Sequence, residues 1–152
     1  MPSRYTFTDY SPAWPADFGR EAENLKRLLG DELLSVHHIG STSVPGLAAK
    51  PIIDLIPLVR DITYVDEHTS VLQEAGYNAW GEYGLPGRRY FTKDRDGFRT
   101  HNVHIYQVDD PDVDRHLAFC AYLRSHEHAR TDYGALKREI YARHPADIDV
   151  YN

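Results

Sequence analysis

The fold is decided by residues 38–56, HIGSTSVPGLAAKPIIDLI. A β-prone run that ends at Ile39 enters a turn rich in glycine and hydroxyl residues, and a second apolar run begins at Ile52. A single carboxylate, Asp54, stands inside that second run. An ionised carboxylate in an apolar layer is unfavourable unless a cation, a metal or several N–H donors compensate its charge. The stretch therefore predicts a core strand that also forms part of a binding site.

Composition and charge indicate one compact domain, residues 1–152, in a cytoplasmic protein. No apolar run reaches the roughly 20 residues of a membrane span, and the N-terminus lacks the order of a signal peptide. The single Cys120 fits a reducing compartment. With a net charge of −6 and no dense block of Lys or Arg, a broad nucleic-acid surface is disfavoured, because such surfaces are basic. The sequence leaves the oligomeric state open.

Apolar spacing and turn residues predict the order of the elements. Helices are expected at 15–29, 63–75, 111–125 and 127–143, with a short helical turn at 47–50. Strands are expected at 33–39, 52–59 and 100–108, and a hairpin at 77–83 and 89–92. This order predicts an α+β fold, a small mixed β-sheet with helices packed on it.

Four segments identify a family: 38–56, GRRYF at 87–91, HNVH at 101–104 and LAFCAYLR at 117–124. Together they resemble the GrpB family, also called UPF0157, over nearly the whole chain. The resemblance implies the nucleotidyltransferase fold, and with it a transferase that acts on a nucleotide and a small acceptor. Because the family commonly continues beyond the position of Asn152, it also implies that a final C-terminal helix is missing.

The sequence departs from the metal-binding pattern of that superfamily. A Gly-Ser or Gly-Gly pair is followed there by a strand with Asp-x-Asp or Asp-x-Glu, and another strand supplies a third carboxylate. Here Ile56 stands two residues beyond Asp54, and the third strand offers Asn102 and His104. Two-metal nucleotidyl transfer needs hard oxygen ligands around Mg²⁺. The alternative function is therefore a non-catalytic module of the same fold that binds a nucleotide or another anion.

The candidate ligands of a divalent metal (Mg, Mn or Zn) are Asp54 and His104. Strand alternation places Asn102, His104 and Tyr106 on one face of the sheet and His101 on the other. Imidazole suits Zn²⁺, Fe²⁺ or Mn²⁺ better than Mg²⁺, and a metal-dependent hydrolase is a third reading of this pair. The alternative is a buried histidine that hydrogen-bonds Asp54.

The candidate substrate-binding residues are Gly40, Ser41, Thr42, Ser43, Arg88 and Arg89, and the candidate catalytic residues are Asp54 and Lys50. The resemblance implies that N–H groups of the turn hold phosphates, which the physics of anion binding at a helix start supports. The alternative is a structural turn whose hydroxyls cap 47–50.

The cationic candidates have structural alternatives as well. Lys50 would stabilise developing charge or form a salt bridge with Asp54, and Arg88 and Arg89 would clamp a phosphate or remain solvated strand charges. Lys137 is expected to be a surface charge of its helix. The dispersed tyrosines are expected to be packing residues.

Overall fold

The computed structural model describes residues 7–143. A single mixed sheet has the strand order β1-β2-β5-β4-β3. The strands are β1 (Leu33–Ile39), β2 (Ile53–Val59), β3 (Asn78–Ala79), β4 (Arg89–Arg95) and β5 (Phe98–Gln107). The helices are α1 (Trp14–Leu29), α2 (Ile62–Glu67), α3 (Thr69–Glu74), α4 (Asp112–Ser125) and α5 (Glu127–Arg143), with short 3₁₀ turns η1 (Gly30–Glu32) and η2 (Ser41–Ser43). The predicted α+β class and mixed sheet are confirmed.

Strand pairing brings the polar residues of three strands to one face. β2 runs antiparallel to β1 and parallel to β5, and β5 runs antiparallel to β4. In this register Asp54 lies beside Ile39 on one side and Asn102 on the other. Tyr90 of β4 is paired with His104 of β5. Since paired residues of neighbouring strands point to the same face, these side chains share one surface of the sheet.

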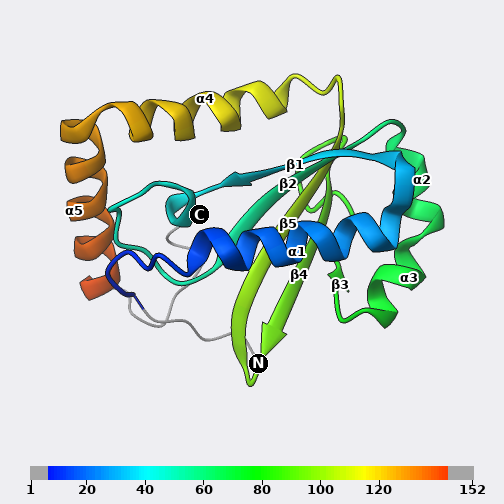
Figure 1. The fold of residues 1–152 in the computed structure, drawn as a ribbon, viewed down its shortest axis with the longest axis horizontal. Coiled ribbons are helices and arrows are strands. Elements are labelled where there is room, and N and C mark those ends of the chain that lie inside the picture. The colour runs from blue at the N-terminus through cyan, green and yellow to red at the C-terminus, as the bar shows by residue number, and fades with distance from the viewer. Residues whose placement is uncertain (1–6, 144–152) are drawn as a thin grey trace.

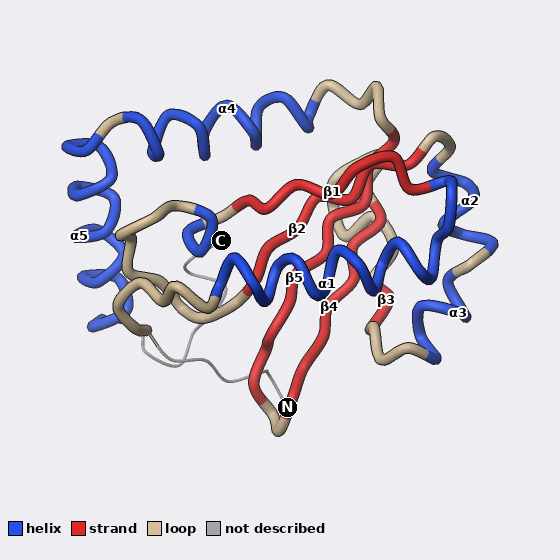
Figure 2. Tube along the Cα trace, viewed as in Figure 1, coloured by secondary structure: helices blue, strands red, loops and turns tan. Residues whose placement is uncertain are grey.

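Helices cover the two faces of the sheet unequally. Helix α1 crosses one face, with α2 and α3 at one end of it (Figure 1). Their core includes Leu25, Leu29, Leu55, Val65 and Ile105. Helix α4 runs along the other side of the sheet, and α5 turns away from its end (Figures 1 and 2).

The face below α4 carries Asp54 among apolar residues. Ile56, Leu58 and Tyr106 of the sheet pack there against Val113 and Cys120 of α4. A smaller cluster joins the segment after η2 to α4 and α5, and it contains Val44, Leu47, Leu123, Ala129 and Tyr133. Helix α5 therefore closes one end of the α4 face.

A buried polar cluster joins α1 to the opposite face. Glu21, which is 7% exposed, accepts hydrogen bonds from the Tyr77 hydroxyl and from Lys93 Nζ at 3.0 Å. His101 Nε2 lies 3.5 Å from Glu21 Oε2. Burial alone would raise the pKa of Glu21, but the Tyr77 hydrogen bond and the cationic neighbours hold that pKa below its ordinary value. His101 thus lies on the face opposite to His104, as strand alternation predicts.

Three predicted elements differ from the structure. The helix expected at 63–75 is two helices, because the His68 ring bonds the Tyr64 carbonyl at 2.8 Å and the backbone leaves helical geometry there. The first hairpin strand shrinks to Asn78–Ala79, since positive φ angles at Gly81, Tyr83 and Gly84 curl the chain away. Residues 47–50 form no helical turn, and Ala49 instead forms an isolated β-bridge with Thr8.

Two other expectations concern the chain's ends and membranes. The missing final helix would follow Asn152 and lies outside the described residues. Within residues 7–143, no helix combines the length and the apolar composition that a bilayer crossing demands.

Candidate functional site

A cleft of about 730 Å³ opens on the α4 face of the sheet. It is lined from η2, β2, β4, β5, α4, α5 and the loop before β4. The polar and charged side chains that line it are Ser41, Thr42, Lys50, Asp54, Tyr83, Arg88, Tyr90, Thr92, Arg99, Asn102, His104, His116, Tyr133 and Lys137. Among these described residues, four are cationic and one is a carboxylate, although the whole protein has a net charge of −6.

Asp54 lies directly under the turn that follows β1. Its side chain is 23% exposed, and Oδ1 accepts a hydrogen bond from Asn102 Nδ2 at 3.0 Å. On the turn side, a Cβ added at Gly40 would lie 2.6 Å from Asp54 Oδ2. Gly40 also has a φ of +72°, which side chains other than glycine rarely adopt. The glycine therefore lets the turn press against the carboxylate.

The Asn102 amide is oriented by two donors. Its Oδ1 accepts from the Tyr90 hydroxyl at 3.0 Å and from Arg99 Nη1 at 3.2 Å, and the residue is only 4% exposed. The amide nitrogen consequently faces Asp54. This strand, from which the superfamily would supply a third acid, supplies a hydrogen-bond donor instead.

His104 is oriented in a similar way by Arg88. Arg88 Nη1 lies 3.2 Å from His104 Nδ1, and because a guanidinium can only donate, Nδ1 must accept. In the neutral ring the proton is then on Nε2, which faces Asp54 Oδ1 at 3.6 Å. Arg88 is 8% exposed as a residue, and its guanidinium also donates to the carbonyls of Glu82 and Tyr83 at 3.2 and 2.9 Å.

This donor set does not fit the two-metal centre of the superfamily. Ile56 is apolar, Asn102 donates its amide, and the Nε2 of His104 carries the proton in this arrangement. Among residues 7–143, no group of three or more His, Cys, Asp or Glu side chains is placed to hold a metal ion. The structure brings the two predicted ligands, Asp54 and His104, close together, with Asp54 Oδ1 and His104 Nε2 3.6 Å apart.

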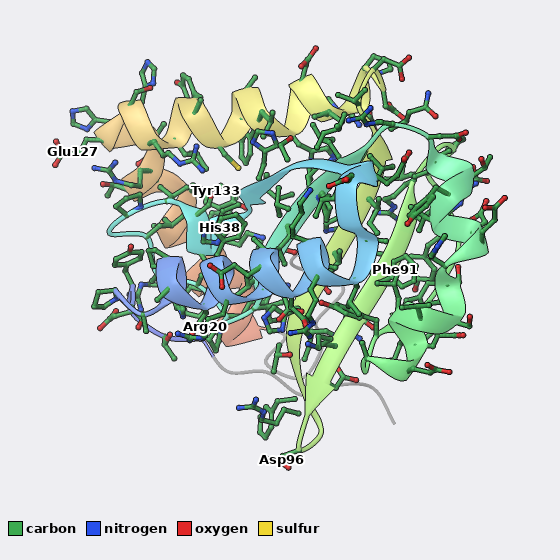
Figure 3. The ribbon with its side chains drawn as sticks, turned by 45° about the vertical axis from the view of Figure 1, so that its right-hand side comes forward. Arg20, His38, Phe91, Asp96, Glu127 and Tyr133 are labelled. Atoms are coloured by element: carbon green, nitrogen blue, oxygen red, sulfur yellow. The ribbon has the colours of Figure 1, made fainter. Side chains whose placement is uncertain are left out.

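The hydroxyls of the turn have largely internal partners. Thr42 Oγ1 lies 2.9 Å from His38 Nε2 and 3.4 Å from the Ile52 carbonyl. Ser43 Oγ donates to the Gly40 carbonyl at 2.6 Å and does not line the cleft. The Ser41 side chain hydrogen-bonds Tyr133 of α5. Figure 3 labels His38 and Tyr133 beside this turn.

His38 has an unusual protonation equilibrium. Its ring stacks on Phe18 with centroids 4.8 Å apart. Burial lowers its pKa to about 4; the Asp54 charge opposes this shift and the Arg124 charge adds to it. His38 therefore supports the turn as a neutral ring at physiological pH.

The two adjacent arginines, Arg88 just before β4 and Arg89 at its first position, point to opposite faces of the sheet. Arg88 lines the cleft, whereas Arg89 binds Asp66 of α2 through Nε at 2.6 Å and Nη2 at 3.1 Å. Successive side chains of a strand point to opposite faces, so the expected double clamp cannot form. Of the predicted site residues, Gly40, Ser41, Thr42, Lys50, Asp54, Arg88 and His104 line the cleft, while Ser43 and Arg89 do not.

Sequence reasoning missed several residues of the cleft. Lys137, expected at the surface, lines it from α5, and burial lowers its pKa while the Asp54 charge opposes the shift. Arg99 and the aromatic residues Trp80, Tyr83 and Tyr90 line it as well. Tyr133 and Lys137 are four residues apart and therefore lie on one face of the helix. That spacing was the sequence signal that could have identified α5 as a wall of the cleft.

The sequence is similar to members of one family. The family model described as GrpB protein matches residues 4–152. UPF0157 protein YqkA of Bacillus subtilis is 44% identical over 142 residues, which cover 93% of this chain and 41% of YqkA. A dephospho-CoA kinase of Mycolicibacterium paratuberculosis is 32% identical over 165 residues, covering 92% of this chain and 40% of that protein. The chain thus spans about two fifths of either relative.

Solved structures show the same fold. Conserved protein GrpB from Enterococcus faecalis superposes with a TM-score of 0.91 at 49% identity, over 95% of this chain and 88% of that chain. Cid1 in complex with its short product ApU gives a TM-score of 0.60 at 13% identity, over 89% of this chain and 45% of Cid1. The likeness to Cid1 shows the nucleotidyltransferase fold alone.

Proposed function

This chain belongs to the GrpB family, and from that premise we propose that its cleft binds a nucleotide or a similar small phosphate-bearing anion without a two-metal centre. The observation that carries the proposal is the reversal of charge in the cleft. Four cationic side chains and one carboxylate line it, on a protein whose net charge is −6. A cleft that concentrates one sign of charge attracts ligands of the other sign.

The size and lining of the cleft agree with a nucleotide-sized ligand. Its volume of about 730 Å³ lies within the range of roughly 300–1,000 Å³ that is usual for small-molecule sites. Lys50 and Lys137 reach it from different elements, the segment after η2 and helix α5. Phosphate oxygens accept charge-assisted hydrogen bonds from such ammonium groups. Binding would therefore depend on these two lysines.

The surroundings of Asp54 favour binding over turnover. Nucleotidyl transfer in this fold would need metals that align the attacking and leaving oxygens, and the residues around Asp54 do not form that ligand set. Nucleotidyl transfer remains the second candidate because Asp54 faces the cleft from a central strand, behind a Gly-Ser turn. Cid1, a poly(U) polymerase of the same fold, has been solved with the UTP analogue UMPNPP.

Calorimetry on the purified chain tests the proposal. Nucleoside triphosphates, tripolyphosphate and uncharged nucleosides are titrated in EDTA, and then with Mg²⁺, Mn²⁺ or Zn²⁺. We expect triphosphate binding to persist in EDTA, and Lys50→Met or Lys137→Met to weaken it roughly 10- to 100-fold, as the loss of a hydrogen bond from a charged donor predicts.

The matched control is Arg115→Ala, which removes one positive charge from an exposed residue of α4 outside the cleft. Its Kd for triphosphate should equal that of the wild type. The proposal is wrong if neither triphosphate nor tripolyphosphate binds at millimolar concentration. Robust metal-dependent nucleotidyl transfer that Asp54→Asn abolishes would instead establish the enzyme.

A further inference from the structure

We infer that Trp80 and Tyr83 form a stacking platform for the planar ring of the ligand, so that a nucleobase contacts the loop before β4. The inference rests on the proposed function and deepens it. It assigns the aromatic part of a nucleoside phosphate to one wall of the cleft. The phosphates of the same ligand would contact Lys50 and Lys137, which belong to other elements.

The two side chains are large, aromatic and open at the cleft. Both line it, and Trp80 is 49% and Tyr83 62% exposed. They are the outer members of a ladder of rings. Centroids lie 5.9 Å apart for Trp80 and Tyr83, 5.3 Å for Tyr83 and Tyr90, and 5.2 Å for Tyr90 and His104. The ladder leads from the exposed loop to the side chain that faces Asp54.

Hydrogen bonds connect the Trp80 ring and the Tyr83 backbone to their surroundings. The Trp80 indole Nε1 donates to Thr92 Oγ1 at 2.9 Å, and Thr92 is 1% exposed. Tyr83 has a φ of +49°, which bulky residues rarely adopt, and Arg88 Nη2 bonds its carbonyl at 2.9 Å. A site whose side chains are already ordered loses less entropy when the ligand binds.

The chemistry of the platform indicates its ligand. An open aromatic face stacks on any planar ring, and every nucleobase offers such a face. The cationic side chains of the same cleft, Lys50 and Lys137 among them, favour an anionic group on that ligand. A nucleoside phosphate combines both parts in one molecule, whereas inorganic phosphates offer only the anion.

Parallel titrations of a nucleoside triphosphate and of tripolyphosphate test the platform. Trp80→Ala and Tyr83→Ala should each weaken triphosphate binding about 5- to 150-fold, which corresponds to the ~1–3 kcal/mol that stacking of one base contributes. Tripolyphosphate binding should not change. Trp80→Phe and Tyr83→Phe keep a ring and should retain most of the affinity.

Tyr122→Ala is the matched control, because Tyr122 is 51% exposed on α4 and does not line the cleft. It should leave both Kd values unchanged. If the wild type binds triphosphate and the alanine variants bind it equally well, the platform is refuted while the proposed function stands. An equal loss for both ligands would also refute stacking, since it would mean that the substitutions disturb the phosphate site. Failure of the wild type to bind either ligand refutes the proposed function itself.

Discussion

Replacing Gly40 by alanine measures how closely the turn packs on Asp54. The new Cβ would lie 2.6 Å from Asp54 Oδ2 and 3.1 Å from its Cγ. Overpacking of this kind typically costs about 1–3 kcal/mol. The backbone of Gly40, with φ +72° and ψ −175°, adds about 1–3 kcal/mol for any other residue. The free energy of unfolding should therefore fall by about 2–6 kcal/mol.

Two other glycines separate these costs. Gly46 has a φ of +81° with no atom within 4 Å of an added Cβ, so Gly46→Ala should show the backbone cost alone. Gly19 lies inside α1, also with open space around it. Gly19→Ala should stabilise the protein by roughly 0.5–1 kcal/mol through helix propensity. Urea denaturation followed by circular dichroism gives each free energy, and an unchanged m value shows that the unfolded state is comparable.

A double variant assigns the clash to the carboxylate. In an Asp54→Ala background the Oδ2 and Cγ atoms are absent and only the contact with the Cβ of residue 54, at 3.1 Å, remains. Gly40→Ala should therefore cost clearly less there than in the otherwise wild-type protein, though still more than Gly46→Ala. The reasoning is refuted if Gly40→Ala costs no more than Gly46→Ala in the otherwise wild-type protein. A cost that is unchanged by Asp54→Ala would refute it as well.

Two predictions concern titratable groups of the core. The first concerns His38, whose pKa is about 4 in the native protein. As the pH drops from 6.5 to 4, His38 takes up a proton more readily in the unfolded protein than in the native one, so the free energy of unfolding should fall. We expect a loss of about 1–2 kcal/mol, allowing for the partial solvent access of the ring. Urea denaturation at pH 7, 5.5 and 4 should show this loss of unfolding free energy in the wild type and not in His38→Gln. Equal losses in both proteins would contradict the role of His38. Glu21→Gln leaves Lys93 facing a neutral amide and should cost about 1–3 kcal/mol at pH 7. Glu23→Gln, at an exposed position of the same helix, should stay within about 0.5 kcal/mol, and equal effects of the two substitutions would count against a buried ion pair.

From the sequence one could predict which side chains of the sheet face the site, but not which residues of other elements form the remaining walls of the cleft. Alternation along a strand places Asn102 and His104 on one face, and the structure confirms that placement. The same rule separates Arg88 from Arg89, although their adjacency suggested a clamp. Period-two alternation is a local property of the chain, so it can be read without knowing which strands pair.

Long-range placement was not accessible in the same way. The contact between Asp54 and Asn102 depends on a parallel pairing of two residues that lie 48 positions apart in the sequence. Lys137 enters the cleft because Leu123, Ala129 and Tyr133 pack α4 and α5 against the segment after η2. Neither arrangement follows from local periodicity, because each is decided by which apolar faces pack together.

The carboxylate inside an apolar strand needs compensation, and N–H groups of the fold supply part of it. Asn102 donates to Asp54 Oδ1 and is itself oriented by Tyr90 and Arg99. The Nε2 of His104, oriented by Arg88, faces the same oxygen. Oδ2 lies against Gly40, where there is no room even for a methyl group.

Within the fold, Oδ1 of Asp54 accepts a hydrogen bond and Oδ2 is packed closely against the turn. An incoming phosphate would be repelled by this negative charge and attracted by the cationic side chains around it. In the proposed complex the carboxylate would exclude anions from its own position and leave them to the lysines, and the rings of Trp80 and Tyr83 would contact the rest of the ligand. On this reasoning Asp54→Asn should leave metal-free triphosphate binding intact or strengthen it, whereas a metal-bridged nucleotide would lose affinity on the same substitution.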